Sequence, residues 1–371
     1  MSAEAGDAQP MAGDIAPFET ENAAFERWLG TQCDVVADDL AYKRERMARN
    51  AFVFLRATFF GWSTVIGNVC GDLADAPPAV AIGDTHVENF GTWRDADGRL
   101  IWGVNDFDEA AIIPYAYDLV RLTTSVRLYP GSKPSGREAT EAILTGYRRG
   151  IGHPGPTILD EAALAMRPLA NCSDADRLKF WVEVAGYPTG TPTAAAEESL
   201  RASLPAGAVI NRFATRRKGG GSLGRPRFLA IATWQGGTIV REAKALVPSA
   251  WNWALGTPPQ PTQFLALAHG RFRAPDPFLD VHGGFVVRRI AADSRKIEFG
   301  DGASSDINLK LLDAMGFDVA SIHASGADRA AVLQHLNRQP DGWLRTAAKA
   351  AEESVQRDFA AFTSNPHAGT P

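Results

Sequence analysis

One short acidic segment contains residues whose types and spacing suit phosphoryl transfer. Residues 81–109 read AIGDTHVENFGTWRDADGRLIWGVNDFDE. Asp84 and Asn89 have the D-x-x-x-x-N spacing of phosphoryl-transfer loops, and an Asp-Phe-Asp triplet runs from Asp106 to Asp108. Such transfer needs a carboxylate that faces the acceptor hydroxyl, together with an amide oxygen and a second carboxylate on one metal. Because Mg²⁺ prefers oxygen ligands, the segment predicts a metal–phosphate site.

A simpler interpretation competes with this one. Asp and Asn in loops most often form turns and helix caps, and the D-x-x-x-x-N spacing alone would favour that explanation. When the neighbouring Asp-Phe-Asp triplet at Asp106 is considered as well, the sequence favours a metal–phosphate site over a structural turn. His86 lies in the same loop, where we expect a structural hydrogen bond. No second His or Cys stands close enough in sequence to suggest a zinc site.

Two short apolar runs are placed to position the acidic residues. Residues 79–82 (AVAI) predict a buried strand that delivers Asp84 to a loop, and residues 100–104 (LIWGV) predict a strand that delivers Asp106. Between them, residues 94–99 (RDADGR) contain a D-G turn. The two runs are therefore expected to form a hairpin with acidic residues at its two ends, where both carboxylates could reach one metal.

A glycine-rich loop lies far away in the sequence. Residues 219–224 (GGGSLG) satisfy G-x-G-x-x-G through Gly219, Gly221 and Gly224, inside a strand-like region at 208–242. A glycine loop between strands lets backbone N–H groups approach a polyphosphate. A single match is a weak signal, and an ordinary hairpin turn is the default alternative.

Nucleotide phosphates would also need a cation on a following strand. Lys244 and Arg241 are both available, and the choice between them stays open, because an ammonium and a guanidinium are not interchangeable. A helix expected near 260–272 carries no Glu to pair with this cation. Either His269 or a carboxylate elsewhere takes that role, or the pair is absent.

Basic residues also occur in the N-terminal helical region, residues 19–49. Four of them alternate with apolar positions and are expected mainly to face solvent: Lys43, Arg44, Arg46 and Arg49. Arg56 differs, because it sits inside the apolar run FVFLRATFF and a buried arginine needs a partner. We expect either a core carboxylate or the acidic hairpin to supply it.

Composition limits the function classes. The net charge is −5 and no strongly basic run occurs, so nucleic acid is not expected as a partner. No apolar run approaches the length of a membrane span, so a membrane is not expected either. Three sparse cysteines (Cys33, Cys70 and Cys172) without metal-type spacing, and a start that lacks a signal peptide, favour the cytoplasm.

Several segments resemble known families. IGDTHVENF, VNDFDE and YAYDLVRL resemble the motifs of aminoglycoside and choline-type phosphotransferases. More closely, DLAYKRERMARNAFVFLRATFFGW, GDTHVENFGTW and VNDFDE resemble a bacterial family, domain of unknown function 2252, which is grouped with the protein-kinase-like fold. This resemblance runs from Asp39 through Phe362 and is most specific over 39–128.

The resemblance implies roles for individual residues. It implies that Asp84 is the catalytic base, that Asn89 and Asp106 are metal ligands, and that Asp118 braces the loop. Relatives place a lysine just before Glu-Ala, where this chain has Arg241.

The expected fold is α+β, a two-lobed protein-kinase-like fold with a rearranged lobe order. The catalytic motifs precede the nucleotide-type strands, and circular permutation is one route to that order. Four parts are expected: a disordered tail at 1–18, a mainly helical lobe at 19–204 that contains the catalytic hairpin 79–109, a β-rich nucleotide-binding lobe at 205–300, and helices at 301–371 that complete the helical lobe. The glycine loop should face Asp84 and Asp106 across a cleft.

The leading functional hypothesis is an ATP- and Mg²⁺-dependent phosphotransferase with a small-molecule acceptor. Asp84 would accept the acceptor's proton, Asn89 and Asp106 would hold Mg²⁺, and Asp108 would hold a second ion or orient Asn105. The glycine loop and Lys244 or Arg241 would hold the ATP phosphates. Two alternatives stay open: transfer of AMP on the same fold, and a non-catalytic nucleotide-binding pseudokinase or scaffold.

Overall fold

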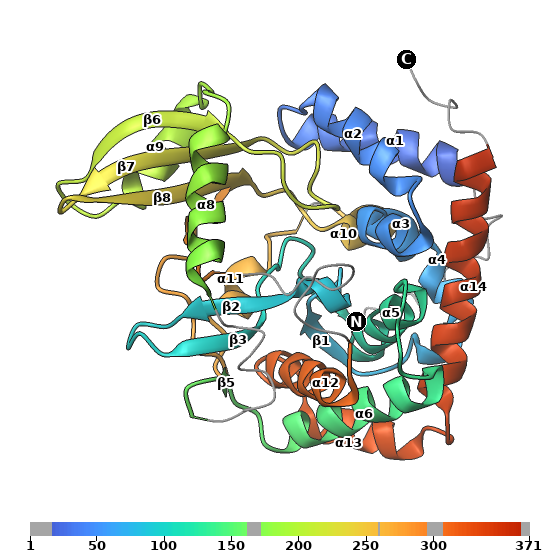
Figure 1. Cartoon of the computed structure of the whole chain (residues 1–371). Helices are drawn as coiled ribbons and strands as arrows, with labels where there is room; N and C mark the ends of the chain where they lie inside the picture. Colours follow the sequence, from blue (N-terminus) through green and yellow to red (C-terminus); the bar gives the residue numbers. More distant parts are fainter. Residues whose placement is uncertain (1–16, 162–171, 259, 295–306, 365–371) are drawn as a thin grey trace, which may run out of the picture.

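The computed structural model describes residues 17–161, 172–258, 260–294 and 307–364. It is a mixed α+β protein in which helices surround two small antiparallel sheets, while a five-stranded sheet lies to one side (Figure 1). Residues 1–16 of the expected tail, residues 162–171 of the expected helical lobe, and residues 295–306, where the expected β-rich lobe meets the C-terminal helices, lie outside the described residues.

Four helices follow one another at the N-terminal end of the described chain: α1 (Phe18–Gln32), α2 (Ala37–Met47), α3 (Ala51–Ala57) and α4 (Phe59–Val69). The Asn50 side chain caps α3 by accepting from the Val53 N–H. Aromatic side chains, such as the stacked pair Phe25 and Phe60, pack these helices together. No single described helix is long and apolar enough to cross a membrane, and only the pair α3–α4, bent by 98°, would be by length and composition.

The acidic segment forms two strand pairs instead of the expected hairpin. Strand β1 (Pro78–Ala81) pairs with β4 (Ala111–Pro114), whereas β2 (Phe90–Arg94) and β3 (Leu100–Val104) form the hairpin around the D-G turn, and β5 (Thr157–Ile158) joins β3. The prediction that 79–82 and 100–104 are partners was wrong. Residues 90–94 are themselves a nearly fully buried strand, and their proximity to the turn gives them the pairing.

The remaining helices of this part pack closely around the small sheets: α5 (Tyr115–Leu128), α6 (Gly136–Gly152), α12 (Leu309–His323), α13 (Arg329–Arg338) and α14 (Trp343–Ser364). Helices α6 and α12 touch through glycines. A Cβ added at Gly146 would lie 1.8 Å from the Asp313 carbonyl oxygen, and one at Gly316 would lie 2.1 Å from that of Ile143. Only glycine permits this approach.

The five-stranded sheet is antiparallel throughout, in the order β6-β7-β8-β10-β9. Its strands are β6 (Val209–Thr215), β7 (Arg227–Trp234), β8 (Gly237–Ala245), β9 (Asp280–His282) and β10 (Phe285–Ile290). Helices α8 (Asp174–Gly186) and α9 (Ala194–Ala202) pack on opposite faces of this sheet. Successive strand residues point to opposite faces, so Leu229 packs in the cluster that contains α8 and Ala230 in the cluster that contains α9. Two short helices, α10 (Ala250–Ala254) and α11 (Phe264–Ala268), lie between β8 and β9 in the chain.

Candidate active site

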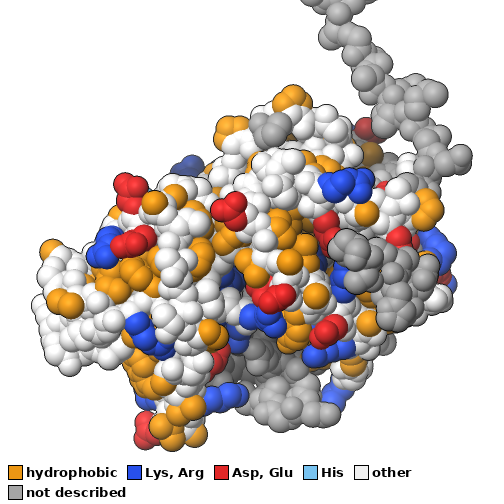
Figure 2. Space-filling view, turned by 90° about the horizontal axis from the view of Figure 1, so that it is seen from above, with side chains coloured by type: hydrophobic (Ala, Val, Ile, Leu, Met, Phe, Trp, Pro, Cys, Tyr) orange, Lys and Arg blue, Asp and Glu red, His pale blue; other side chains and the backbone are white. Residues whose placement is uncertain are grey.

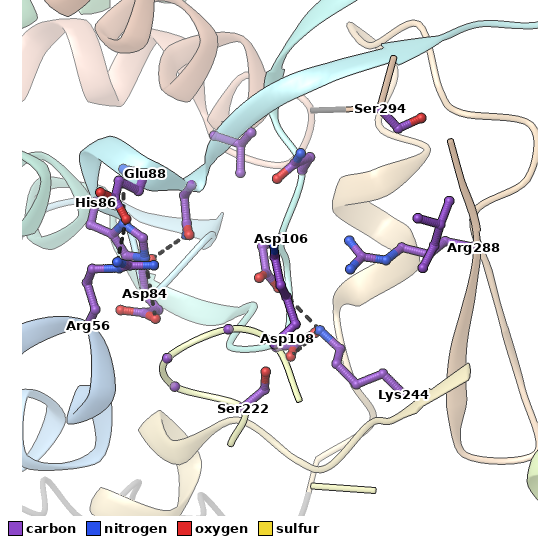
Figure 3. A pocket seen from close by; sticks show the side chains of 18 of the residues that line it. Arg56, Asp84, His86, Glu88, Asp106, Asp108, Ser222, Lys244, Arg288 and Ser294 are labelled. Carbon is purple, nitrogen blue, oxygen red and sulfur yellow. Dashed lines mark hydrogen bonds and ion pairs between the residues drawn. The ribbon is translucent and has the colours of Figure 1, made fainter. Parts of the chain in front are cut away.

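A cleft of about 1600 Å³ brings the acidic segment and the five-stranded sheet together. Side chains from both parts point into it (Figure 3). Its described lining contains most of the residues singled out in the sequence: Asp84, Asn89, Asp106, Asp108, Gly219, Gly221 and Lys244. These residues are therefore neighbours in space although more than 100 positions separate the two groups in the chain.

The loop that carries Asp84 is held by a buried carboxylate. Asp118, at the start of α5, accepts hydrogen bonds from the N–H groups of Ile82 (2.7 Å) and Gly83 (3.0 Å). Gly83 has φ +79°, and an added Cβ would lie 2.4 Å from the Glu109 carbonyl oxygen, so this turn requires glycine. Asp118 thus makes the loop contacts that the family resemblance implied.

A buried arginine binds the Asp84 carboxylate directly. Arg121 is fully buried on α5, and its Nε and Nη2 lie 3.1 and 2.5 Å from Asp84 Oδ1. Nη2 also donates to the Leu55 carbonyl at 2.8 Å, and the guanidinium lies over the rings of Phe59 and Trp62. Burial raises the pKa of Asp84, Arg121 opposes the rise, and the Asp106 charge adds to it.

Sequence analysis missed Arg121. The only available signal was a charged residue inside the apolar helix YAYDLVRL, three positions after Asp118. That signal says an arginine needs a partner, but it does not say which carboxylate provides it.

Asn89 and His86 are fixed by bonds within the same loop. Asn89 Nδ2 donates to the Asp84 carbonyl at 2.5 Å, and the Asn105 N–H donates to the Asn89 carbonyl at 3.1 Å. The second bond joins the start of β2 to the end of β3, next to Asp106. His86 Nδ1 accepts from the Glu88 N–H at 3.1 Å, so a neutral imidazole carries its proton on Nε2, which lies 4.0 Å from Asp84 Oδ2.

Lys244 connects the five-stranded sheet to the acidic triplet. Its Nζ lies 2.6 and 2.5 Å from the two carboxylate oxygens of Asp108 and 3.5 Å from Asp106 Oδ1. Arg225 Nη1 also approaches Asp108, at 3.4 Å, and its Nη2 lies 2.6 Å from Glu109. Asp108 therefore supplies the carboxylate partner that the sequence left unidentified. Asp106 is the more accessible carboxylate, with 28% of its side chain exposed against 9% for Asp108.

Two candidate residues lie away from the cleft lining, and both assignments need correction. Arg241 occupies the opposite face of β8 from Lys244, where Nε donates to the Ser203 carbonyl at 3.0 Å and the guanidinium lies over the Phe278 ring. Arg241 and Lys244 are three positions apart on one strand, and residues an odd number of positions apart point to opposite faces of the sheet. Gly224 has φ +94°, and its added Cβ would lie 2.4 Å from Leu40 Cδ2, so this glycine serves a turn against α2.

The glycine loop between β6 and β7 is anchored through its carbonyl groups and one hydroxyl. Arg46 Nη1 donates to the Gly219 carbonyl at 2.6 Å, Lys43 Nζ lies 3.4 Å from that of Gly221, and Arg227 Nη2 donates to Ser222 Oγ at 3.0 Å. Backbone N–H groups of residues 219–222 donate to no acceptor within the described chain. A Cβ added at Gly221 would lie 3.4 Å from Asp84 Oδ2.

The expectation that the basic residues of α2 simply face solvent was therefore wrong for Lys43 and Arg46. Lys43 is 5% exposed, and burial lowers its pKa to about 8. Their register on α2 places both side chains against a loop that lies more than 170 positions later, which no local pattern reveals.

Positive charge is concentrated in the cleft. Thirteen Lys or Arg and eight Asp or Glu residues belong to its described lining, although the whole chain carries a net charge of −5. On the outer face shown in Figure 2, by contrast, basic and acidic side chains are scattered among one another. Such a cleft favours an anionic ligand.

The metal-binding potential of the site is limited. Nowhere in the described ranges do three or more His, Cys, Asp or Glu side chains form a group that could hold a metal. Asn89 and Asp106 offer one amide oxygen and one carboxylate, and Mg²⁺ is commonly bound by one or two carboxylates with substrate phosphates and water. The residues present fit a metal that is shared with a phosphate ligand.

Comparisons with known proteins bear on part of the chain. No curated protein and no solved structure matches it. Residues 35–153, which include α2, α3, the acidic segment and α5, match the model of a family described as "Uncharacterized protein conserved in bacteria (DUF2252)", and this part of the chain is similar to that family.

Proposed function

We propose that this protein is an ATP- and Mg²⁺-dependent phosphotransferase of the kinase-like class with a small-molecule acceptor. One observation carries the proposal: the glycine loop, the strand lysine and the acidic residues meet in a single cleft. A Cβ added at Gly221 would lie 3.4 Å from the Asp84 carboxylate, and Lys244 lies against both Asp106 and Asp108. A triphosphate spans on the order of 10 Å, so one ligand could touch both groups.

Asp84 suits the role of general base. Arg121 holds Oδ1, so the other oxygen, Oδ2, is the one that a substrate hydroxyl can approach. Burial raises the pKa of Asp84, which makes the carboxylate a better proton acceptor than an exposed aspartate. The positive charge of Arg121 limits that rise and keeps the carboxylate oriented.

Phosphate binding would use the remaining groups. Asn89 and Asp106 would hold Mg²⁺, which when bound neutralises charge on the phosphates. The unpaired N–H groups of residues 219–222 would face the phosphates. The loop joins the first two strands of the sheet order and Lys244 lies on the third, the arrangement that protein kinases use. Here these strands follow the catalytic loop, so the proposed kinase-like fold has a rearranged lobe order.

Two other functions remain as outcomes of the tests. The scaffold hypothesis rests on the absence of a Glu near 260–272 and on Arg241 where relatives place a lysine. The Asp108–Lys244 pair gives the strand cation a carboxylate partner and supports the enzyme proposal instead. AMP transfer would use the same cleft, and mass spectrometry separates it from phosphate transfer, because the product gains AMP instead of one phosphate. We propose a cytoplasmic location for this activity, and the sparse cysteines support it.

The decisive experiment is thermal unfolding of the full chain with ATP, with and without Mg²⁺. A nucleotide at about 100 times its Kd should stabilise the protein by roughly 2.7 kcal/mol. Asp106→Asn should abolish the Mg²⁺-dependent part of this shift, because it removes an anionic ligand and keeps the volume. Asp97→Asn, in the exposed turn between β2 and β3, is the matched control and should behave as the parent. If no nucleotide shifts the transition, the proposal fails.

A further inference from the structure

Three arginines gather at the Asp84 end of the cleft. Arg46 lies on α2, Arg49 follows that helix, and Arg56 lies on α3, and all three line the cleft. In Figure 3, Arg56 lies beside Asp84 and His86, on the side away from Lys244 and Arg288. Arg56 therefore lies on the opposite side of Asp84 from Lys244 (Figure 3), whereas the glycine loop reaches the arginines through the bond from Arg46 to the Gly219 carbonyl.

This arginine cluster has little compensating negative charge. Arg56 Nη1 forms an ion pair with Glu88. Burial lowers the pKa of Arg46, the charges of Arg56 and Arg49 lower it further, and Tyr42 and Glu88 oppose this decrease. Within the described residues Arg49 has no ion-pair partner. The charge of Arg56 also acts on Asp84, a carboxylate that Arg121 already binds. Three guanidinium groups thus face Glu88 and one aspartate that is already paired, and this arrangement attracts an anion.

Contacts within the protein hold two of these arginine side chains in place. The Arg56 guanidinium lies 5.5 Å from the centre of the Phe52 ring, whose own neighbour Tyr129 lies 4.9 Å away centre to centre. The glycine loop fixes Arg46 through the Gly219 carbonyl. Two of the three side chains are therefore held in place before any ligand binds, which lowers the entropy lost on binding.

We propose, on the basis of the function proposed above, that the acceptor is a small hydroxyl compound with an anionic group, a phosphate or a carboxylate, bound by Arg46, Arg49 and Arg56. Guanidinium groups bind both anions through paired hydrogen bonds. The acceptor hydroxyl then gives its proton to Asp84 Oδ2 as its oxygen bonds to the γ-phosphorus of ATP. The bond from that phosphorus to the bridging oxygen breaks, and ADP leaves. Cationic acceptors such as aminoglycosides and choline would be repelled from this end.

Binding of simple anions to the full chain tests the acceptor site. Inorganic phosphate and acetate are titrated by calorimetry into protein saturated with Mg²⁺ and a non-hydrolysable ATP analogue, and the stronger of the two identifies the anionic group. Arg49→Gln should weaken the anion by about tenfold or more, as expected for a charge-assisted hydrogen bond, while nucleotide affinity stays unchanged. Arg44→Gln is the control, because Arg44 pairs with Glu26 and does not line the cleft.

The outcomes separate this inference from the proposed function. Anion binding that needs Arg49 but occurs in a protein that binds no nucleotide supports the anion site and overturns the phosphotransferase proposal. Anion binding that competes with the nucleotide assigns the anion to the donor phosphates and overturns the acceptor site. Equal losses in Arg49→Gln and Arg44→Gln, or no anion binding at all, also overturn it.

Discussion

The two walls of the cleft are assembled in different ways. The acidic wall takes Asp84, Asn89 and Asp106 from one span of 23 residues, and the loop and hairpin between β1 and β4 position all of them. The opposite wall combines α2, the glycine loop and three strands of the five-stranded sheet, which are distant in sequence. The acidic wall is a local structure, whereas the glycine-loop wall exists only in the folded chain.

The two walls are also joined by charge. Asp108 pairs with Lys244 and Glu109 with Arg225, so these two pairs join the walls, while a third pair, Asp84 with Arg121 of α5, lies behind the acidic wall. Each pair is buried or nearly so, and a buried charge without its partner is costly. Folding of the acidic wall therefore depends on the residues that carry these cations, even though its own motif is local.

Removing the arginine behind the acidic wall should have the largest effect. Arg121→Met leaves the partly buried Asp84 carboxylate without the fully buried Arg121, and breaking a buried pair typically costs about 3–5 kcal/mol. Denaturant unfolding should show this loss, and Arg121→Met with Asp84→Asn should recover part of it. Arg149→Gln is the control, because its pair with Asp313 is half exposed and such pairs contribute about 0–1 kcal/mol.

A loss below about 1 kcal/mol in Arg121→Met would contradict this dependence. Such a result would mean that the stability of the acidic wall does not depend on the cation that pairs with Asp84.

Replacing Lys43, the buried lysine behind the glycine loop, should change the free energy of unfolding by an intermediate amount that depends on pH. The pKa of Lys43 is about 8 in the folded chain and 10.5 when unperturbed, so below pH 8 the fold carries the full cost of the buried charge. Between these values the unfolded chain binds more protons, so stability rises with pH as that cost is relieved. Lys43→Met should stabilise the protein at pH 7 by up to roughly 3 kcal/mol.

Unfolding free energies of the Lys43→Met variant and the parent, measured at pH 7 and near pH 10.5, check the sign. The advantage of the variant should shrink toward the higher pH. Lys349→Met, an exposed position on α14, should give a difference that does not change with pH. A constant advantage for Lys43→Met would mean that its ammonium is not buried against the loop.

The sequence predicted the local acidic wall better than the wall that contains the glycine loop. The spacing within residues 84–106 predicted that Asp84, Asn89 and Asp106 share one site, and all three line the cleft because short-range order fixes their geometry. The strand pairing failed, since two apolar runs near one turn compete for the same partner and sequence does not rank them. Arg121, Lys43 and Arg46 were missed or misplaced because their partners lie 37 to 178 positions away. The choice between Lys244 and Arg241 needed the face of β8, which only the register supplies.

The smallest expected effect tests whether the two walls meet. A Cβ at Gly221 would lie 3.1 Å from the Arg56 carbonyl oxygen and 3.4 Å from Asp84 Oδ2, whereas one at Gly220 would meet only ordinary contacts at 3.8 Å or more. Neither glycine has positive φ, so alanine fits the folded backbone at both positions. Both substitutions also reduce the conformational entropy of the unfolded chain to the same extent. Gly221→Ala should therefore weaken Mg²⁺·ATP binding by about 1 kcal/mol, as typical for overpacking, and Gly220→Ala should not. Because the two variants differ only in which residue carries the methyl group, equal affinities in calorimetry would show that the glycine loop does not reach the Asp84 carboxylate.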